Sequence, residues 1–393
     1  MKKAIQSIIT VILTVCIITS FTAYADLKDR PWTENESVRV INHVVYRLDG
    51  EHWEVADFFD TAEAALDESI IKIKVEESID GKPVTEIQNM KYYYVNEEYS
   101  NSSKPVKMVY TDENEFVTEI ELPETITVIC HDAFNGFRSL KKINIPKGIK
   151  KIGANAFDYC SSLESLVLPS IDGKTLAVKG CESLKKVEFI GNPSSIGNML
   201  QCYELSSISI PKSVKKLGSF EDSGLTKLAV KNTVSISKHG FMNNTKLKKF
   251  VFKNVKSVKK YVIPKEAFCL TPELTEFRMP KAKEIYINSY AFNGSGIKKI
   301  STKNVVKIGF EAFSDCKNLT EFTVPKTINS IGNRAFEDCN KLRKLYINTK
   351  NTKIINKTNA FKYLNKSCKV YVKTKAMKNA VKKSGFTGKV IVR

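Results

Sequence analysis

The feature that most constrains this chain is a unit of 21 to 27 residues that recurs from about Ile126 to Val372. One copy occupies Ile149–Pro169. It opens on spaced aliphatic residues and Gly153, continues to Phe157, and reaches Cys160 three residues later. Its last apolar residues alternate with other residues before a proline, which is the period of two that is typical of a β-strand. Each copy therefore predicts one short strand and a turn.

The copies align through one aromatic slot that is filled eleven times in succession. The slot holds Phe134, Phe157, Val178, Met199, Phe220, Phe241, Phe268, Phe292, Phe313, Phe336 and Phe361. A fixed period in the low twenties, with one strand per period, indicates a leucine-rich-repeat solenoid whose stacked coils bury an apolar face that one coil cannot bury alone. We therefore expect a repeat solenoid with one short strand per coil in a parallel sheet, joined by irregular turns. Eleven coils at about 4.8 Å per strand give a rod of roughly 50 Å.

The repeat pattern of Ile-Gly, Ala-Phe, Cys, Leu and Leu-x-Ile-Pro resembles the BspA-like leucine-rich repeats of bacterial surface and secreted proteins. The resemblance covers residues 124–372 and is clearest at Ile126–Pro146, Ile149–Pro169, Val305–Pro325 and Ile328–Ile347. The copies between Ser170 and Asn254 depart from the pattern at Val178, Met199, Ser223 and Asn244. The resemblance implies a role in adhesion and contact with host surfaces.

The first 25 residues predict a secretory signal peptide. They combine a basic start, an apolar run over Ile8–Ile18 and the small-x-small sequence Ala23-Tyr24-Ala25. The apolar run is too short to span a membrane comfortably, so we expect cleavage after Ala25 and no transmembrane anchor in the mature chain. The predicted localisation is secreted or associated with a cell surface.

Residues 26–68 predict an N-terminal cap, because solenoids need a cover over the open end of the core. Two short segments, Val45–Leu48 and Trp53–Val55, flank an Asp-Gly turn signal and predict a β-hairpin. A short helix is expected over Thr61–Asp67. The C-terminal end shows a strand at Val370–Val372, and residues 373–393 then predict a helix and a last strand, which gives a strand-helix-strand cap.

Residues 69–123 predict a first coil that is interrupted between about Gln88 and Glu115 by an insertion. The insertion contains Tyr92, Tyr93, Tyr94 and Tyr99. Insertions into repeat proteins lie on one face and often bind partners, so these tyrosines are candidate contacts. The alternative is a β-hairpin whose tyrosines pack on the first coils.

Charge is distributed unevenly along the chain. Residues 26–123 hold 23 acidic and 10 basic residues, whereas residues 124–393 hold 19 acidic and 50 basic residues. Such asymmetry suggests an interaction surface, and it allows weak head-to-tail association between the acidic head of one molecule and the basic repeats of another. A lysine-rich genomic composition is the alternative.

Eight cysteines follow the signal peptide, and five of them occupy one repeat slot that is expected to point inward. These are Cys160, Cys181, Cys202, Cys316 and Cys339. Neighbouring coils place them within disulfide range, but with parallel rather than converging Cβ vectors. We therefore expect reduced core thiols that act as small hydrophobic groups.

The lysines form the clearest candidate binding face. The residue before the middle aliphatic of each strand should face solvent, and in seven of eleven coils it is lysine: Lys142, Lys186, Lys227, Lys249, Lys299, Lys344 and Lys369. We call these seven residues the lysine ladder. A polyanion along the ladder would relieve repulsion and release counterions. The alternative is that an exposed strand face must be polar and lysine fills it.

No motif predicts catalysis, a metal site or a cofactor. The four histidines stand in no metal-binding helix pattern, and Cys-x-x-Cys, Gly-x-Ser-x-Gly and phosphate-binding glycine loops are absent from the sequence. We therefore expect a non-catalytic binding or adhesion scaffold that engages proteins or extracellular matrix. One alternative is a binder of wall teichoic acid, glycosaminoglycan or extracellular nucleic acid through the lysine ladder. An enzyme within residues 26–123 is the least favoured hypothesis.

Overall fold

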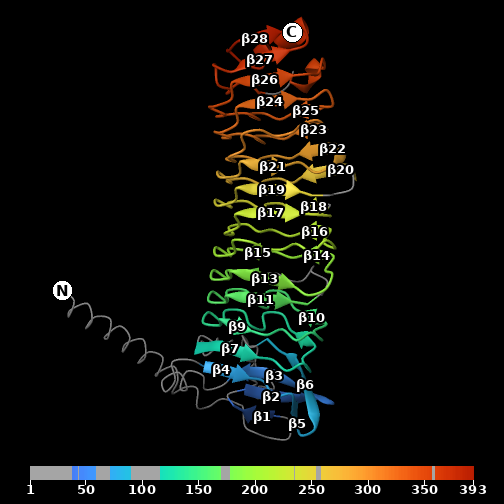
Figure 1. Cartoon of the computed structure of the whole chain (residues 1–393), viewed down its shortest axis with the longest axis vertical. Helices are drawn as coiled ribbons and strands as arrows, with labels where there is room; N and C mark the ends of the chain where they lie inside the picture. The colour runs from blue at the N-terminus through green and yellow to red at the C-terminus, as the bar shows by residue number, and fades with distance from the viewer. Residues whose placement is uncertain are drawn as a thin grey trace, which may run out of the picture.

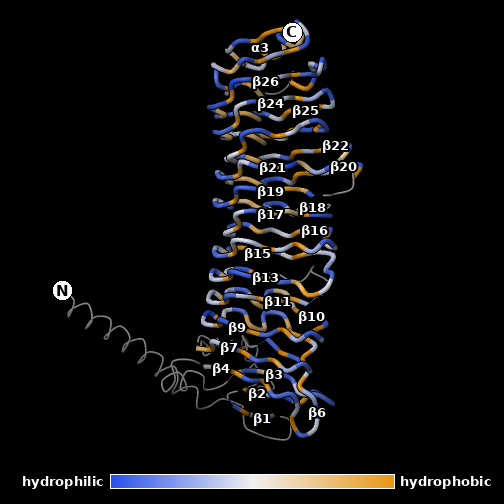
Figure 2. The backbone as a smooth tube through the Cα atoms, viewed as in Figure 1, coloured by the Kyte–Doolittle hydropathy of each residue, from blue (hydrophilic) through white to orange (hydrophobic). Residues whose placement is uncertain are grey.

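The computed structural model describes residues 38–42, 44–58, 71–89, 116–169, 178–233, 235–253, 258–355 and 359–393. The coils stack along one long axis in chain order, from the N-terminal strands at one end to the C-terminal strands at the other (Figure 1). Blue and orange segments alternate within each coil along the whole stack (Figure 2), as expected when each coil turns one part of its chain inward. The predicted parallel-sheet solenoid is confirmed.

The strands that the repeat pattern predicts run parallel to one another along one face of the stack. They are β9 (Lys142–Ile143), β11 (Ser165–Leu168), β13 (Lys186–Phe189), β17 (Lys227–Val230), β19 (Lys249–Phe252), β21 (Glu276–Arg278), β24 (Glu321–Val324), β26 (Lys344–Ile347) and β27 (Lys369–Val372). We call these the ladder strands. Before them lie β4 (Ile71–Lys74) and β7 (Val117–Glu121), and β7 pairs with both β4 and β9.

A second column of parallel strands, which the sequence analysis did not expect, opens many of the coils. It comprises β8 (Val128–Ile129), β10 (Lys151–Ile152), β14 (Ser195–Ile196), β16 (Lys216–Leu217), β18 (Ser235–Ile236), β20 (Val258–Ile263), β22 (Ala282–Ile287), β23 (Val305–Ile308) and β25 (Ser330–Ile331). Most of these strands are two residues long, too short for a period-two pattern to reveal them. Each such coil therefore has two strands rather than the predicted one.

The N-terminal end is β-rich, as predicted. The hairpin of β2 (Val44–Asp49) and β3 (His52–Phe58) is present, and β1 (Val38–Ile41) adds an antiparallel strand that the sequence analysis missed. β3 then pairs in parallel with β6 (Lys82–Ile87), which joins the column of β8 and also pairs with β5 (Ser78–Ile79). Buried Trp53 fixes this end because its indole Nε1 donates to the Ile79 carbonyl at 3.0 Å. The predicted signal peptide and the helix over Thr61–Asp67 lie outside the described residues.

The C-terminal end has the predicted strand-helix-strand order. Helix α3 (Lys375–Lys383) lies between β27 and β28 (Val390–Val392), which pair in parallel. The Thr374 hydroxyl caps the helix by accepting from the Met377 amide at 3.1 Å. Met377 and Val381 are fully buried, so the helix closes the end of the core. A short 3₁₀-helix, η3 (Thr352–Ile354), precedes it.

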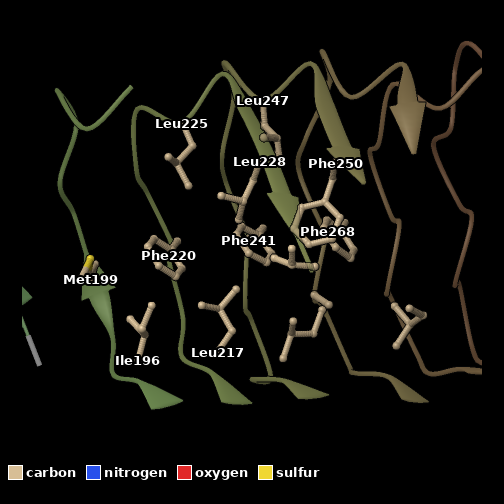
Figure 3. Close-up of a cluster of buried hydrophobic side chains, with 14 of the residues drawn as sticks. Ile196, Met199, Leu217, Phe220, Leu225, Leu228, Phe241, Leu247, Phe250 and Phe268 are labelled. Atoms are coloured by element: carbon tan, nitrogen blue, oxygen red, sulfur yellow. The ribbon is translucent and has the colours of Figure 1, made fainter. Parts of the chain in front are cut away.

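The aromatic slot forms an internal spine, as predicted. All eleven of its residues are fully buried. From Phe220 to Phe361 successive rings stack at centroid separations of 5.3–6.1 Å and interplanar angles of 4–9°. Figure 3 shows part of this row, from Met199 through Phe220 and Phe241 to Phe268, with leucines on the ladder-strand side. Stacked rings in consecutive coils make the core continuous along the axis.

Each turn around the spine is more regular than expected. Non-glycine residues with positive φ recur two positions before the spine and two positions after it, as at Glu311 (φ 48) and Asp315 (φ 57) around Phe313. The left-handed region is costly for most residues, and Gly, Asn and Asp enter it most easily. Gly, Asn and Asp fill many of these positions, but Tyr159, Leu270, Tyr290 and Arg334 also stand there, so the turn geometry fixes the backbone without restricting the residue type.

The glycine that follows many opening strands is required by close contact between coils. A Cβ added to Gly332 would lie 2.4 Å from backbone atoms of Gly309 and Phe310, and one added to Gly153 would lie 2.2 Å from the His131 amide nitrogen. Any side chain at these positions would force the neighbouring coil away. This contact explains the Ile-Gly element of the repeat.

The five slot cysteines are buried free thiols, and the structure gives most of them a more specific role than that of a small hydrophobic group. Four donate to the carbonyl oxygen of the spine phenylalanine one coil earlier, at 3.0–3.1 Å: Cys160 to Phe134, Cys181 to Phe157, Cys316 to Phe292, and Cys339 to Phe313. Asn244 replaces the thiol and donates to the Phe220 carbonyl in the same way at 2.7 Å. The slot therefore favours a compact donor that adds a hydrogen bond to a turn carbonyl, since the Phe134 and Phe292 carbonyls also accept from the Phe137 and Ser295 amides at 3.3 and 3.0 Å.

Candidate binding face

The lysine ladder lies where the sequence places it. All seven lysines are exposed on the outer face of the solenoid, at the first position of a ladder strand or, for Lys299, at the equivalent position of its coil. The register brings some of them side by side: Lys227 is the Cα partner of Lys249, and Lys344 is the Cα partner of Lys369. Adjacent strands are about 4.8 Å apart, so a row of positive charge follows the solenoid axis.

The ladder is not uniform, because acidic side chains neutralise part of it. Lys142 pairs with Glu119 at 3.4 Å, and Lys249 pairs with Glu276 at 2.7 Å. Lys186 pairs at 2.6 Å with Glu188, two residues along the same strand. Within the described residues, no ion pair joins an acidic side chain to any of the other four ladder lysines, which are Lys227, Lys299, Lys344 and Lys369. The seven lysines thus divide into paired and unpaired members, which the sequence analysis did not anticipate.

Acidic residues gather on the turns rather than on the ladder strands. Within two positions of the spine residues the repeats carry nine Asp or Glu and three Lys or Arg. The acidic ones are Asp132, Asp158, Glu221, Asp222, Glu266, Glu311, Asp315, Glu337 and Asp338. Six of these have positive φ, and four of the six are aspartates, which tolerate that conformation better than most residues. The repeats therefore have a basic sheet face and an acidic turn edge, although their overall charge is strongly positive.

One cluster on the turn edge illustrates its electrostatics. Glu266 contacts the His239 ring and lies 3.1 Å from Lys265 Nζ. Partial burial acts against ionisation of Glu266, but the hydrogen bonds and charges of Lys265 and His239 prevail and hold its pKa below the ordinary value. Glu221, on the preceding coil, has a pKa raised mainly by burial. The charges of the cluster therefore balance one another within it. Among the described residues, no group of three or more His, Cys, Asp or Glu could hold a metal ion.

Two tyrosines on the ladder face were missed by the sequence analysis. Tyr346 and Tyr371 follow ladder lysines by two positions, so they face the same way as Lys344 and Lys369. They are Cα partners, and their rings stack at 4.9 Å with an interplanar angle of 22°. Reading every second residue of each ladder strand would have found them. The candidate contacts Tyr92, Tyr93, Tyr94 and Tyr99 lie outside the described residues.

Comparison with known proteins identifies the repeats. The family model described as the BspA-type leucine-rich repeat region matches residues 110–219, 175–285 and 234–368. Together these spans cover about two-thirds of the chain. No curated protein matches the chain.

Comparison with solved structures gives the same architecture. The pneumococcal vaccine antigen PcpA is similar to this chain with a TM-score of 0.55 and 21% sequence identity, over 92% of this chain and 100% of that one. A leucine-rich cell surface protein from Faecalibacterium prausnitzii gives a TM-score of 0.47 and 16% identity, over 88% of this chain and 98% of that one. At this level of identity the match to PcpA shows a common fold. No helix among the described residues has the length and apolar character needed to cross a membrane.

Proposed function

Because this chain belongs to the BspA-type leucine-rich repeat family, we propose that it is a non-catalytic binding scaffold that acts outside the cell, secreted or held at a cell surface. The predicted signal peptide over residues 1–25 supports export. The family supports a surface role. The expected ligands are proteins or extracellular matrix.

The observation that carries this proposal is the exposed face of the ladder strands. Its side chains project from strands that lie in register over successive coils, and the buried core beneath holds the backbone of the face in place. A rigid face loses little conformational entropy when it binds, which favours recognition of extended partners. Repeat solenoids present such continuous surfaces because each coil adds one more strand.

A pull-down with the mature protein tests this proposal. Residues 26–393 would be incubated with cell walls, matrix proteins and anionic polymers at two salt concentrations. We expect saturable binding that the double variant Lys227→Glu with Lys299→Glu weakens, because both residues are exposed on the ladder face. The matched control is Lys216→Glu with Lys307→Glu, which makes the same charge change on exposed residues of the opening strands. Equal loss in both variants, or no saturable binding to any surface, would contradict the proposal.

A second candidate, binding of polyanions, is favoured by the register of the lysine ladder. Like charges about 4.8 Å apart repel, and an anionic chain along them would remove the repulsion and release counterions. Retention on heparin or cell walls should then fall steeply as salt rises. Retention that does not change between low and moderate salt would reject this candidate.

The charge asymmetry also supports weak head-to-tail association, in which residues 26–123 of one molecule act as the anionic partner of another. Sedimentation at low salt and high protein concentration tests it. A monomer under those conditions would argue against self-association.

A further inference from the structure

The C-terminal part of the chain contains an unusual concentration of positive charge. Residues 339–393 hold 16 Lys or Arg and no Asp or Glu. Elsewhere in the repeats acidic residues occur in nearly every coil and neutralise some of the ladder lysines. In this segment no acidic side chain is available from its own sequence, so its charge must be balanced by solvent ions or by a partner.

Part of this charge surrounds the stacked tyrosines on the ladder face. Lys344 and Lys369 lie side by side on β26 and β27, and Tyr346 and Tyr371 follow them on the same face. The guanidinium carbon of Arg393 lies 4.4 Å from the ring centroid of Tyr346 and 5.6 Å from that of Tyr371. We call these five residues the C-terminal basic face. It occupies the last rungs of the sheet, near the upper end in Figure 1.

The surroundings of this face differ from those of the three paired ladder lysines, whereas Lys227 and Lys299 likewise have no ion pair within the described residues. Lys142 and Lys249 each form an ion pair with a glutamate of an adjacent strand. Lys344 has Glu321 as its Cα partner on one side, and this glutamate marks the boundary of the face. On its other side lies Lys369, and β28 beyond it carries no acidic residue. Basic residues therefore extend from Lys344 on β26 to Lys369 on β27 and to Lys389 and Arg393, which flank β28, with no acidic residue among them.

We propose that the C-terminal basic face binds an anionic polysaccharide, whose carboxylate, sulfate or phosphodiester groups contact the two lysines, the tyrosine hydroxyls and Arg393. This inference rests on the polyanion candidate above and assigns its site. Guanidinium groups stacked on aromatic rings keep their donors free for such oxyanions, and the stacking holds the group in place. Lysine provides the less directional charge on either side.

The arrangement of the rings favours a polysaccharide over a single-stranded nucleic acid. Proteins that bind single strands stack bases on open aromatic faces. Here the two tyrosine rings face each other, so each occupies one face of the other, and the Arg393 guanidinium lies close to both rings. The surface therefore presents hydrogen-bond donors and positive charge, which select for anionic groups rather than for planar bases.

The test compares variants of the full mature protein on two probes of matched charge, heparin and a single-stranded oligonucleotide. Lys344→Gln with Lys369→Gln should reduce heparin affinity about tenfold at low salt and lower the slope of log affinity against log salt by about 2. The matched control, Lys142→Gln with Lys186→Gln, removes the same charge from paired lysines of the same face. It should change affinity less than about twofold.

A second variant tests the tyrosine hydroxyls without disturbing the stack. Tyr346→Phe with Tyr371→Phe keeps both rings and should reduce heparin affinity about threefold while leaving thermal unfolding unchanged. An unaltered affinity would overturn the role of the hydroxyls.

The outcomes separate the site from the broader polyanion candidate. If the C-terminal and control lysine pairs lose affinity equally, heparin binds the whole ladder and the site is wrong, while the polyanion candidate stands. If the wild-type protein shows no salt-dependent heparin binding, both fail, and the scaffold proposal is judged by its own pull-down. Tighter binding of the oligonucleotide than of heparin would overturn the polysaccharide in favour of nucleic acid.

Discussion

Two stretches of the solenoid solve the same packing problem with different side chains. Around residues 178–202 the spine contains Val178 and Met199, whereas from Phe292 to Phe361 it is a row of stacked rings. The spine residues of both stretches are fully buried. In the first stretch the backbone at the spine forms an extra pair of parallel strands, β12 (Val178–Lys179) and β15 (Met199–Leu200).

The difference shows which part of the repeat is obligatory. The period of the repeat and the burial of the slot are kept in both stretches, but the ring is not. Backbone hydrogen bonds connect the coils at the spine in both stretches, as from the Val178 amide to the Asn198 carbonyl at 2.8 Å and from the Phe292 amide to the Ala312 carbonyl at 2.9 Å. Stacked rings add a second kind of contact only in the stretch from Phe292 to Phe361. The coil therefore forms with either a ring or an aliphatic side chain at the spine, as long as it keeps its contacts with the neighbouring coils.

The largest effect should come from removing a ring. Phe292→Ala leaves a cavity between two stacked neighbours and should cost about 3–5 kcal/mol, whereas Val178→Ala should cost about 1.5–2 kcal/mol. Urea unfolding measures both, and amide hydrogen exchange shows whether the loss is confined to nearby coils. Equal costs would mean that a stacked ring contributes no more to the free energy of unfolding than Val178 does in the stretch where the row of rings is interrupted.

The next effect concerns the thiol hydrogen bonds. Cys316 donates to the Phe292 carbonyl at 3.1 Å, but Cys202 lies at a longer 3.6 Å from the Leu200 carbonyl of its own coil. Replacing each by alanine removes similar volume, yet Cys316→Ala also removes one of the two donors to the buried Phe292 carbonyl, which keeps only the Ser295 amide at 3.0 Å. We expect it to be about 1 kcal/mol more destabilising than Cys202→Ala in urea unfolding. Cys316→Ser should recover part of that difference, and failure to do so would argue that packing alone decides.

Alkaline pH should affect the two stretches alike. Burial raises the pKa of Cys339 to about 12 and also raises the pKa of Cys202 well above the ordinary value near 9. Because the unfolded state ionises first, the stabilisation from each thiol is complete below about pH 8.5 and is lost as pH rises toward 12. Between pH 8 and pH 10, each thiol should lower the free energy of unfolding by about 1–2 kcal/mol. Unfolding of the wild type is compared with that of Cys339→Ser and of Cys202→Ser as a function of pH. Each variant should lose less stability at alkaline pH than the wild type, and a steeper loss in either variant would contradict the prediction.

The smallest effect lies on the surface. Lys186→Gln breaks the exposed pair with Glu188 and should cost at most about 0.5 kcal/mol. Lys344→Gln should leave stability unchanged or raise it slightly, because it relieves repulsion with Lys369. Thermal unfolding at low salt measures both. If Lys344→Gln is the more destabilising change, the lysines of the C-terminal basic face have internal partners after all.

Much of the fold follows from patterns that act over one repeat. The slot from Phe134 to Phe361 predicts the spine, and the alternation before each proline predicts the ladder strands and the exposure of their lysines. The opening strands were missed because two residues such as Lys151-Ile152 carry no periodicity of their own. Their hydrogen bonds form only because the neighbouring coil places its opening strand in register beside them.

The sequence by itself determined the solenoid, its buried slots and the face on which the lysines lie, because each depends on local alternation and a fixed period. The tertiary structure alone decided which charges meet. Glu276 pairs with Lys249, which is 27 residues earlier in the sequence, and the ring of Tyr346 stacks on that of Tyr371, 25 residues later. Both contacts form because successive coils place equivalent positions within about 5 Å of each other. Contacts of this kind depend on the lengths of the intervening turns, and these vary from coil to coil.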